Sequence, residues 1–163
     1  MRAELRRARE EDIAQIEALL IAERLPANGL VEYLDSFFVL SEADKVVGCA
    51  GLECYGEAAL LRSVVVAPER RRRDDGRRLV DTALAEAQRR GVRRAYLFTM
   101  HASLFFGRMG FREVSLEEFE EAVRASRQYE AVSQIPGLRE QVRAMALELG
   151  GSAGQRLTSS RRI

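Results

Sequence analysis

The first half of the chain changes from a helical spacing of apolar residues to the spacing of strands. Behind an acidic turn, apolar positions recur every three or four residues, which predicts a helix that ends near Pro26. A short strand at Leu5–Ala8 precedes it. Three apolar runs then follow at Phe37–Leu40, Val46–Tyr55 and Ala58–Val66, with short polar turns between them. Short turns between strands are typical of an antiparallel meander.

A helical pattern returns after Pro68 and is followed by another strand. Five apolar residues share one helical face before Gly91, and Arg94–Thr99 then reads as a strand. Together with the strand before Pro68, this helix and strand form a β-α-β unit. The elements therefore predict a mixed α/β fold with a central, mostly antiparallel sheet.

The last third of the chain predicts shorter elements. A short helix at Ala102–Met109 leads to a strand at Phe111–Val114, and a capping box of Ser115 and Glu118 predicts a helix through Ser126. Val142–Leu149 fits either a strand or a helix, and we favour the strand.

Length and composition predict one globular domain at 1–149. A chain of 163 residues with 47% apolar residues can bury a core, whereas 150–163 is rich in Gly, Ser and Arg and is expected to be a loose tail. A net charge of +1 gives no overall attraction to nucleic acid or anionic lipid. No apolar run is long enough to span a bilayer, so we expect a cytoplasmic protein.

The two cysteines, Cys49 and Cys54, are five residues apart on one predicted strand. Successive side chains of a strand alternate between faces, so these two thiols are expected on opposite faces, where they cannot form a disulfide. We expect small buried thiols and no metal site.

Candidate chemistry gathers in the turn between Pro68 and the second helix. This turn, at 70–78, contains six arginines, two aspartates and one glycine. A helix N-terminus offers backbone N–H groups without partners and a partial positive charge, which suits phosphate groups.

Two motifs here resemble one known family. Arg71, Asp74 and Gly76 occupy the places of arginine, glycine and glycine or alanine in the coenzyme A loop of the GNAT N-acetyltransferases, and Phe105–Phe111 resembles that family's aromatic pair and following Gly-Phe. The order of the elements is similar as well. The resemblance implies the GNAT fold and acetyl transfer from acetyl-CoA to a primary amine of a small molecule.

Residues that would contact the cofactor follow from this resemblance. They lie along the strand before Pro68, in the arginine-rich turn, and near the next strand and helix: Val64, Val65, Val66, Arg71, Arg72, Arg73, Asp74, Gly76, Arg77, Thr99 and Phe106. Asp74 departs from the family's glycine and Asp75 from its aliphatic residue. Their charges are expected to weaken coenzyme binding by repulsion without abolishing it, and aspartate tolerates the left-handed backbone that glycine would supply.

Candidates for the chemistry and for the substrate lie on neighbouring strands. Glu53 is the first choice for the general base and His101 is the alternative, and Tyr55 shares the face of Glu53 by the two-residue period. Phe106 stands where many relatives carry a tyrosine that protonates the thiolate, and it has no proton to give. Arg62 interrupts an apolar strand, so it either binds a substrate carboxylate or pairs with Glu53 or Glu57.

A narrower resemblance concerns the acceptor. Segments around Leu25–Pro26, Gly51–Gly56, Leu60–Ser63 and Leu97–Phe106 are similar to the arsenic-resistance N-acetyltransferases, which resemble enzymes that acetylate arsinothricin or phosphinothricin. Those acceptors are glutamate-like, so Arg62, Ser63 and Thr99 would suit them. The resemblance also suggests a homodimer.

Two readings from other classes compete. Asp74, Asp75 and Phe106 are compatible with a GNAT-shaped binding or regulatory module that has lost turnover. Arg70–Arg73 with Arg161 and Arg162 form the alternative of a nucleic-acid patch, but nearby stacking aromatics are missing and the net charge is close to zero. We therefore expect no nucleic-acid partner.

Overall fold

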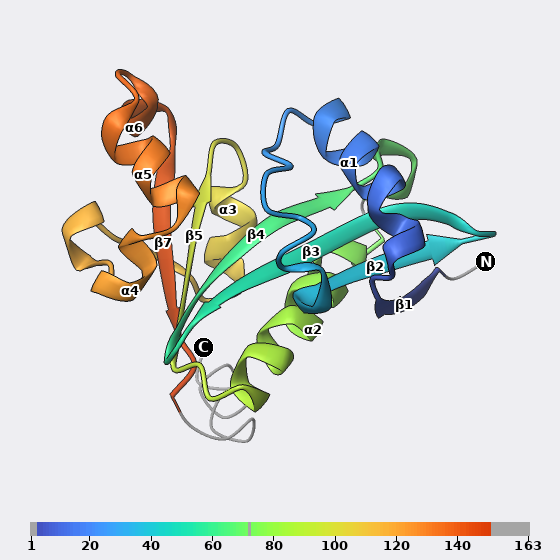
Figure 1. The fold of residues 1–163 in the computed structure, drawn as a ribbon, viewed down its shortest axis with the longest axis horizontal. Helices are drawn as coiled ribbons and strands as arrows, with labels where there is room; N and C mark the ends of the chain where they lie inside the picture. Colours follow the sequence, from blue (N-terminus) through green and yellow to red (C-terminus); the bar gives the residue numbers. More distant parts are fainter. Residues whose placement is uncertain (1–2, 72, 151–163) are drawn as a thin grey trace. The chain divides into compact units, whose positions relative to one another are not determined.

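A computed structural model describes residues 3–71 and 73–150 of the chain (Figure 1). The strands are β1 (Glu4–Arg7), β2 (Phe37–Glu42), β3 (Lys45–Tyr55), β4 (Ala58–Val66), β5 (Arg94–Thr99), β6 (Arg112–Glu113) and β7 (Arg143–Glu148). The helices are α1 (Ile13–Ala22), α2 (Asp75–Arg89), α3 (Ser103–Arg108), α4 (Glu121–Arg124), α5 (Arg127–Gln134) and α6 (Leu138–Gln141). None of the helices within the described ranges is long and apolar enough to cross a bilayer.

The strands are hydrogen-bonded in the order β1-β2-β3-β4-β5-β7-β6. β1, β2 and β3 pair antiparallel, as do β5, β7 and β6, whereas β4 and β5 run parallel through Ala58–Leu60 and Arg94–Tyr96. The mixed α/β fold, the mostly antiparallel sheet and its β-α-β unit are therefore confirmed. The strand predicted near the C-terminus is confirmed as β7.

The chain divides into two compact units. Unit 1 holds the described residues of Met1–Glu53 together with Leu61–Glu86, and unit 2 holds Cys54–Leu60 together with the described residues of Ala87–Ile163. The single domain expected at 1–149 stays a prediction, and 151–163 of the expected tail lies outside the described residues.

The core of unit 1 lies between helices on opposite faces of its strands. On one face Ile16 and Leu20 of α1 pack against Phe37, Val39 and Cys49. On the other face Leu79 of α2 reaches Gly48, whose neighbour Cys49 points the other way because strand side chains alternate. Figure 1 shows α1 and the start of α2 on either side of β2 and β3.

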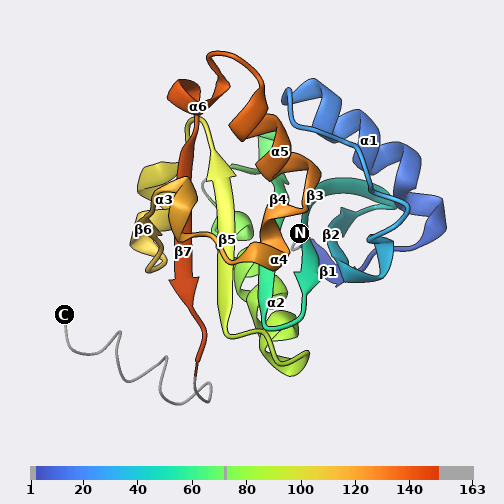
Figure 2. The same ribbon diagram turned by 60° about the vertical axis from the view of Figure 1, so that its left-hand side comes forward.

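The core of unit 2 is built around stacked aromatic rings. Phe119 lies 4.4 Å from the ring of Tyr96, 5.1 Å from Phe98 and 5.3 Å from Tyr129, measured between ring centroids. The segments that carry Phe119, Val123 and Tyr129 therefore cover one face of β5 and β7, and Figure 2 shows α4 and α5 beside β5.

The helix predicted from Ser115 through Ser126 is wrong. The capping box of Ser115 and Glu118 is present, but it begins a single 3-10 turn, and Phe119 and Glu120 are extended before α4. Burial of the Phe119 ring among three aromatic rings requires this break. Ser126 begins a helix rather than ending one, since its hydroxyl accepts a hydrogen bond from the Tyr129 N–H at 3.2 Å at the start of α5.

Gly51 has a packing requirement that can be tested. It pairs with Phe37 across β2 and β3, and a Cβ atom at position 51 would overlap the Phe37 ring. We predict that Gly51→Ala lowers the free energy of unfolding by about 1–3 kcal/mol, because the ring has to move.

Gly107 is the matched control, since a Cβ atom there meets nothing within 4 Å and the residue lies in α3. Gly107→Ala is expected to stabilise the protein by up to about 1 kcal/mol. Denaturant unfolding of both variants measures the difference, and equal stabilities would contradict the packing argument.

Candidate active site

Arg62 is buried inside unit 1 and is surrounded by polar partners. Its side chain is only 3% exposed, and its Nη1 donates to Glu53 Oε2 at 2.7 Å. Nε donates to the Ser63 hydroxyl at 3.0 Å, and Nη2 donates to the Pro26 carbonyl at 3.2 Å. Of the alternatives considered for Arg62, the ion pair with Glu53 is the one present. A contact of Arg62 with substrate stays a prediction.

Aromatic and glycine residues shape the space around this ion pair. The Arg62 guanidinium lies 5.7 Å from the centroid of the Phe37 ring, and Phe37 lies over Gly51. Gly29 has φ 78°, and a Cβ atom added to it would lie only 3.3 Å from Arg62 Nη1. The segment after α1 therefore closes over Arg62, held by the Pro26 carbonyl.

Ser63 has an unusual backbone for a residue inside a strand. Its φ is 58°, in the left-handed region, and the residue is buried. Its carbonyl accepts a hydrogen bond from the Cys49 thiol at 3.2 Å. Burial raises the pKa of Cys49 to about 12, so this thiol stays protonated at neutral pH and is a donor rather than a nucleophile. Cys49 and Cys54 do not form a disulfide. Cys49 is buried, whereas Cys54 is half-buried, so the expectation of two buried thiols is wrong for Cys54.

The turn between β4 and α2 carries the predicted cofactor residues at 71–77 and leads into a helix of 15 residues. Arg71, Arg73 and Arg77 are exposed there, and Arg71 donates to Glu23 Oε2 at 2.7 Å. Asp74 is exposed and has φ 61°, a left-handed conformation that aspartate tolerates. Gly76 lies in the first turn of α2, and Arg72 lies outside the described residues.

Asp75 differs from Asp74 because its carboxylate is buried. It accepts from Arg70 at 3.0 Å and from Arg78 at 3.2 Å, and Arg70 also donates to Glu42 at 2.6 Å. Arg70 is itself buried, so it is not a surface residue of the nucleic-acid patch considered above. Arg161 and Arg162 of that patch lie outside the described residues.

The valines of β4 take two environments. Val65 is buried in the core of unit 1, whereas Val64 and Val66 are half-buried. The Val66 carbonyl accepts from Arg71 Nε at 3.3 Å, which ties the end of β4 to the arginine-rich turn. Cofactor contacts of these valines stay a prediction.

The remaining predicted residues belong to unit 2. Tyr55 packs against the aromatic core, and Phe106 is buried edge-to-face against Phe105 and Phe111. The Thr99 hydroxyl accepts from the Ala102 N–H at 3.0 Å and so shapes the turn into α3. His101 is exposed in that turn.

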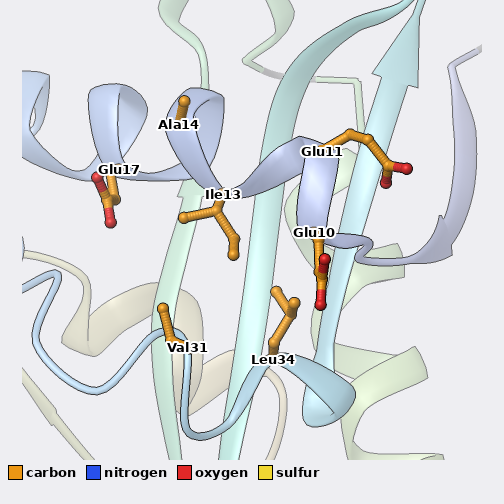
Figure 3. A pocket seen from close by; sticks show the side chains of 7 residues that line it. All are labelled: Glu10, Glu11, Ile13, Ala14, Glu17, Val31 and Leu34. Atoms are coloured by element: carbon orange, nitrogen blue, oxygen red, sulfur yellow. The ribbon is translucent and has the colours of Figure 1, made fainter.

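A surface hollow of about 550 Å³ lies elsewhere in unit 1 and contains none of the predicted site residues. Figure 3 shows Ile13 of α1 pointing toward Val31 and Leu34, with Glu10 and Glu17 at the rim. Sequence reasoning gave no signal for this hollow, because its lining comes from a helix and a loop that are separated in the chain.

The strand β4 leads through an arginine-rich turn into the N-terminus of α2. This arrangement suits the phosphate groups of a cofactor. Residues 34–113 match the family model described as the acetyltransferase (GNAT) domain. The uncharacterized N-acetyltransferase CT2212 of Chlorobaculum tepidum is 33% identical over 95 residues, which cover 58% of this chain and 61% of that protein. The amino-acid acetyltransferase of Vibrio cholerae is 27% identical over 81% of this chain and 32% of its own length. The chain thus spans about three fifths or less of these curated relatives.

Solved structures share the fold. The complex of Rv2747 from Mycobacterium tuberculosis with CoA and NLQ has a TM-score of 0.73 and 26% identity, over 90% of this chain and 99% of that one. N-acetylglutamate synthase from Neisseria gonorrhoeae, complexed with coenzyme A and L-arginine, has a TM-score of 0.75 and 21% identity, over 92% of this chain and 34% of that one. The chain therefore has the GNAT fold.

Breaking the Arg62–Glu53 pair is expected to be costly. Arg62→Met leaves the Glu53 carboxylate buried without its guanidinium, and we predict a loss of about 3–5 kcal/mol in the free energy of unfolding. Arg143→Met is the control, because the Arg143–Glu113 pair is exposed at 59% and 58% and is expected to contribute at most about 1 kcal/mol. Urea unfolding measures both variants. Similar losses of unfolding free energy in the two variants would show that Arg62 does not stabilise the buried Glu53 carboxylate.

Proposed function

We propose that this chain is an N-acetyltransferase that moves the acetyl group of acetyl-CoA to the primary amine of an amino-acid-like small molecule. The observation that carries the proposal is the turn at 71–77, where three exposed arginine side chains surround the N-terminus of α2. Arginine side chains and helix N–H groups are the donors that bind phosphates. Coenzyme A in the related structures supports the choice of cofactor.

The amino-acid character of the acceptor is supported by the relatives. Those from Vibrio cholerae and Aeromonas salmonicida are named amino-acid acetyltransferases. Arsinothricin and phosphinothricin are the narrower candidates, because both are amino acids with an acidic side chain. Glutamate and these two compounds therefore belong in the first panel of acceptors.

The reaction needs few groups from the protein. The amine nitrogen attacks the thioester carbonyl, and the C–S bond breaks. The nitrogen loses a proton, and the thiolate takes up a proton and leaves as the free thiol. Positioning of the amine against the thioester accounts for much of the rate acceleration, and a general base accounts for the rest. Phe106 cannot protonate the thiolate, so water or another group must do so.

Glu53 and His101 are the candidates for the base. The carboxylate of Glu53 is already engaged by Arg62, which favours a role in positioning. Histidine is the side chain that most often acts as a general base, and His101 is exposed in the turn before α3. We therefore propose His101 as the base and Glu53 as the residue that fixes Arg62.

A module that binds coenzyme A without turnover is the second candidate, favoured by the exposed Asp74 carboxylate and by Phe106. Release of free thiol from acetyl-CoA in the presence of the acceptor panel separates the two. We predict thiol release that depends on an amino-acid acceptor. Coenzyme binding without release for any acceptor would favour the module.

Variants of the two candidate bases test the chemistry. We predict that His101→Ala lowers turnover by about a hundredfold, the usual contribution of a general base. Glu53→Gln is expected to lower turnover as well, with coenzyme affinity unchanged in both variants. Calorimetry with coenzyme A supplies that control. Full activity of His101→Ala would contradict the assignment of the base, and full activity of Glu53→Gln would contradict the positioning role of Glu53.

A further inference from the structure

Arg70 is buried although it begins the arginine run. Its side chain is 6% exposed, and it donates to carboxylates from two elements, Glu42 at the end of β2 and Asp75 at the start of α2. The distances are 2.6 Å to Glu42 Oε2 and 3.1 Å from Nε to Asp75 Oδ2. Its backbone N–H donates to the Ala67 carbonyl at 2.8 Å. Arg70 therefore joins β2, the turn and α2.

Asp75 completes this ion cluster of Glu42, Arg70, Asp75 and Arg78. Its side chain is 3% exposed, and its second oxygen, Oδ1, accepts from Arg78 Nη1 at 3.2 Å. Both carboxylate oxygens thus face guanidinium groups. A carboxylate whose charge is balanced in this way by two arginines repels a nearby phosphate far less than a bare one.

We propose that Arg70 and Asp75 are positioning residues for the coenzyme, and that Asp75 raises coenzyme affinity instead of lowering it. The inference rests on the proposed function. By fixing the first turn of α2 to the end of β2, the cluster holds the helix N–H groups in place before the pyrophosphate arrives. A site that is ordered in advance loses less entropy when its ligand binds.

The sequence-based expectation for Asp75 makes the opposite prediction. If the carboxylate repelled phosphate, removing its charge would strengthen binding. Asp75→Asn and Asp74→Asn make the same isosteric change at adjacent positions, one inside the cluster and one exposed. Asparagine also tolerates the left-handed conformation of residue 74.

Calorimetric titration with coenzyme A tests the inference. We predict that Asp75→Asn weakens binding by about tenfold, and raises KM for acetyl-CoA by a similar factor while kcat is retained. Asp74→Asn is expected to bind as tightly as the unmodified protein or more tightly. An Asp75→Asn variant that binds at least as tightly as the unmodified protein would overturn the inference.

A role limited to stability has a different signature. It would lower the thermal midpoint of Asp75→Asn but leave the Kd unchanged well below that midpoint, and this result would also overturn the inference. Glu69→Gln is the control, because Glu69 is near the turn and its pair with Lys45 is exposed. The Glu69→Gln variant is expected to change neither the thermal midpoint nor the Kd.

The double variant Arg70→Met/Asp75→Leu tests whether coenzyme affinity depends on the link between β2 and α2. It removes both buried charges and leaves Glu42 and Arg78, which are 34% and 27% exposed and can reach water. We predict coenzyme binding no tighter than in Asp75→Asn, because the double variant also loses the link from Arg70 to Glu42 at the end of β2. Coenzyme binding as tight as in the unmodified protein would overturn the inference. Absence of coenzyme binding by the unmodified protein would instead overturn the proposed function, and this inference with it.

Discussion

Arginine keeps its positive charge in any protein environment, so a buried guanidinium needs an anionic partner. Unit 1 meets this constraint twice, with Arg62 against Glu53 and with Arg70 against Asp75 and Glu42. Both pairs lie where segments far apart in the sequence meet. The first joins β3, β4 and the segment after α1, and the second joins β2 to α2. Each pair therefore fixes a part of the backbone that apolar packing alone leaves less defined.

The two pairs relate the fold to the chemistry in different ways. Arg62, Phe37 and Gly51 form a layered arrangement in which a small residue admits a ring and the ring supports a guanidinium. The cluster around Arg70 instead supports the turn whose exposed arginines and N–H groups suit phosphates. Acetyl transfer depends mainly on the position of two reactants, so fixed side chains of this kind matter more than a strongly reactive one.

Much of the fold could be predicted because the sheet is made of long apolar runs. β3, β4 and β5 follow such runs closely, and the helical spacing after Pro68 gave the apolar face of α2. The failure at 115–126 has a tertiary cause, since the burial of Phe119 against Tyr96 and Phe98 breaks the helix. α5 was missed because its sequence is mostly polar.

The residues of the candidate site stay a prediction, and their contacts could not be predicted from the sequence. The arginine-rich turn is visible in the local sequence, and the left-handed backbone of Asp74 is one that aspartate tolerates. The pairing of Arg62 with Glu53 was one of several alternatives, because sequence alone does not tell which carboxylate is nearest. Both Asp74 and Asp75 were expected to repel phosphate, and they differ in the structure because Asp75 is buried against Arg70 and Arg78. The sequence did not indicate the close packing at Gly51, since the Phe37 ring that lies over it comes from another strand.

The central claim is that the turn at 71–77 holds the phosphates of the coenzyme. Mapping of backbone amide shifts by NMR during titration with coenzyme A tests it most directly, and a protein of 18.3 kDa is within reach of the method. The account predicts saturable shifts with a Kd of about 1 µM to 1 mM, largest at the amides of residues 73–78. Saturable shifts centred elsewhere, with these amides unchanged, would contradict it.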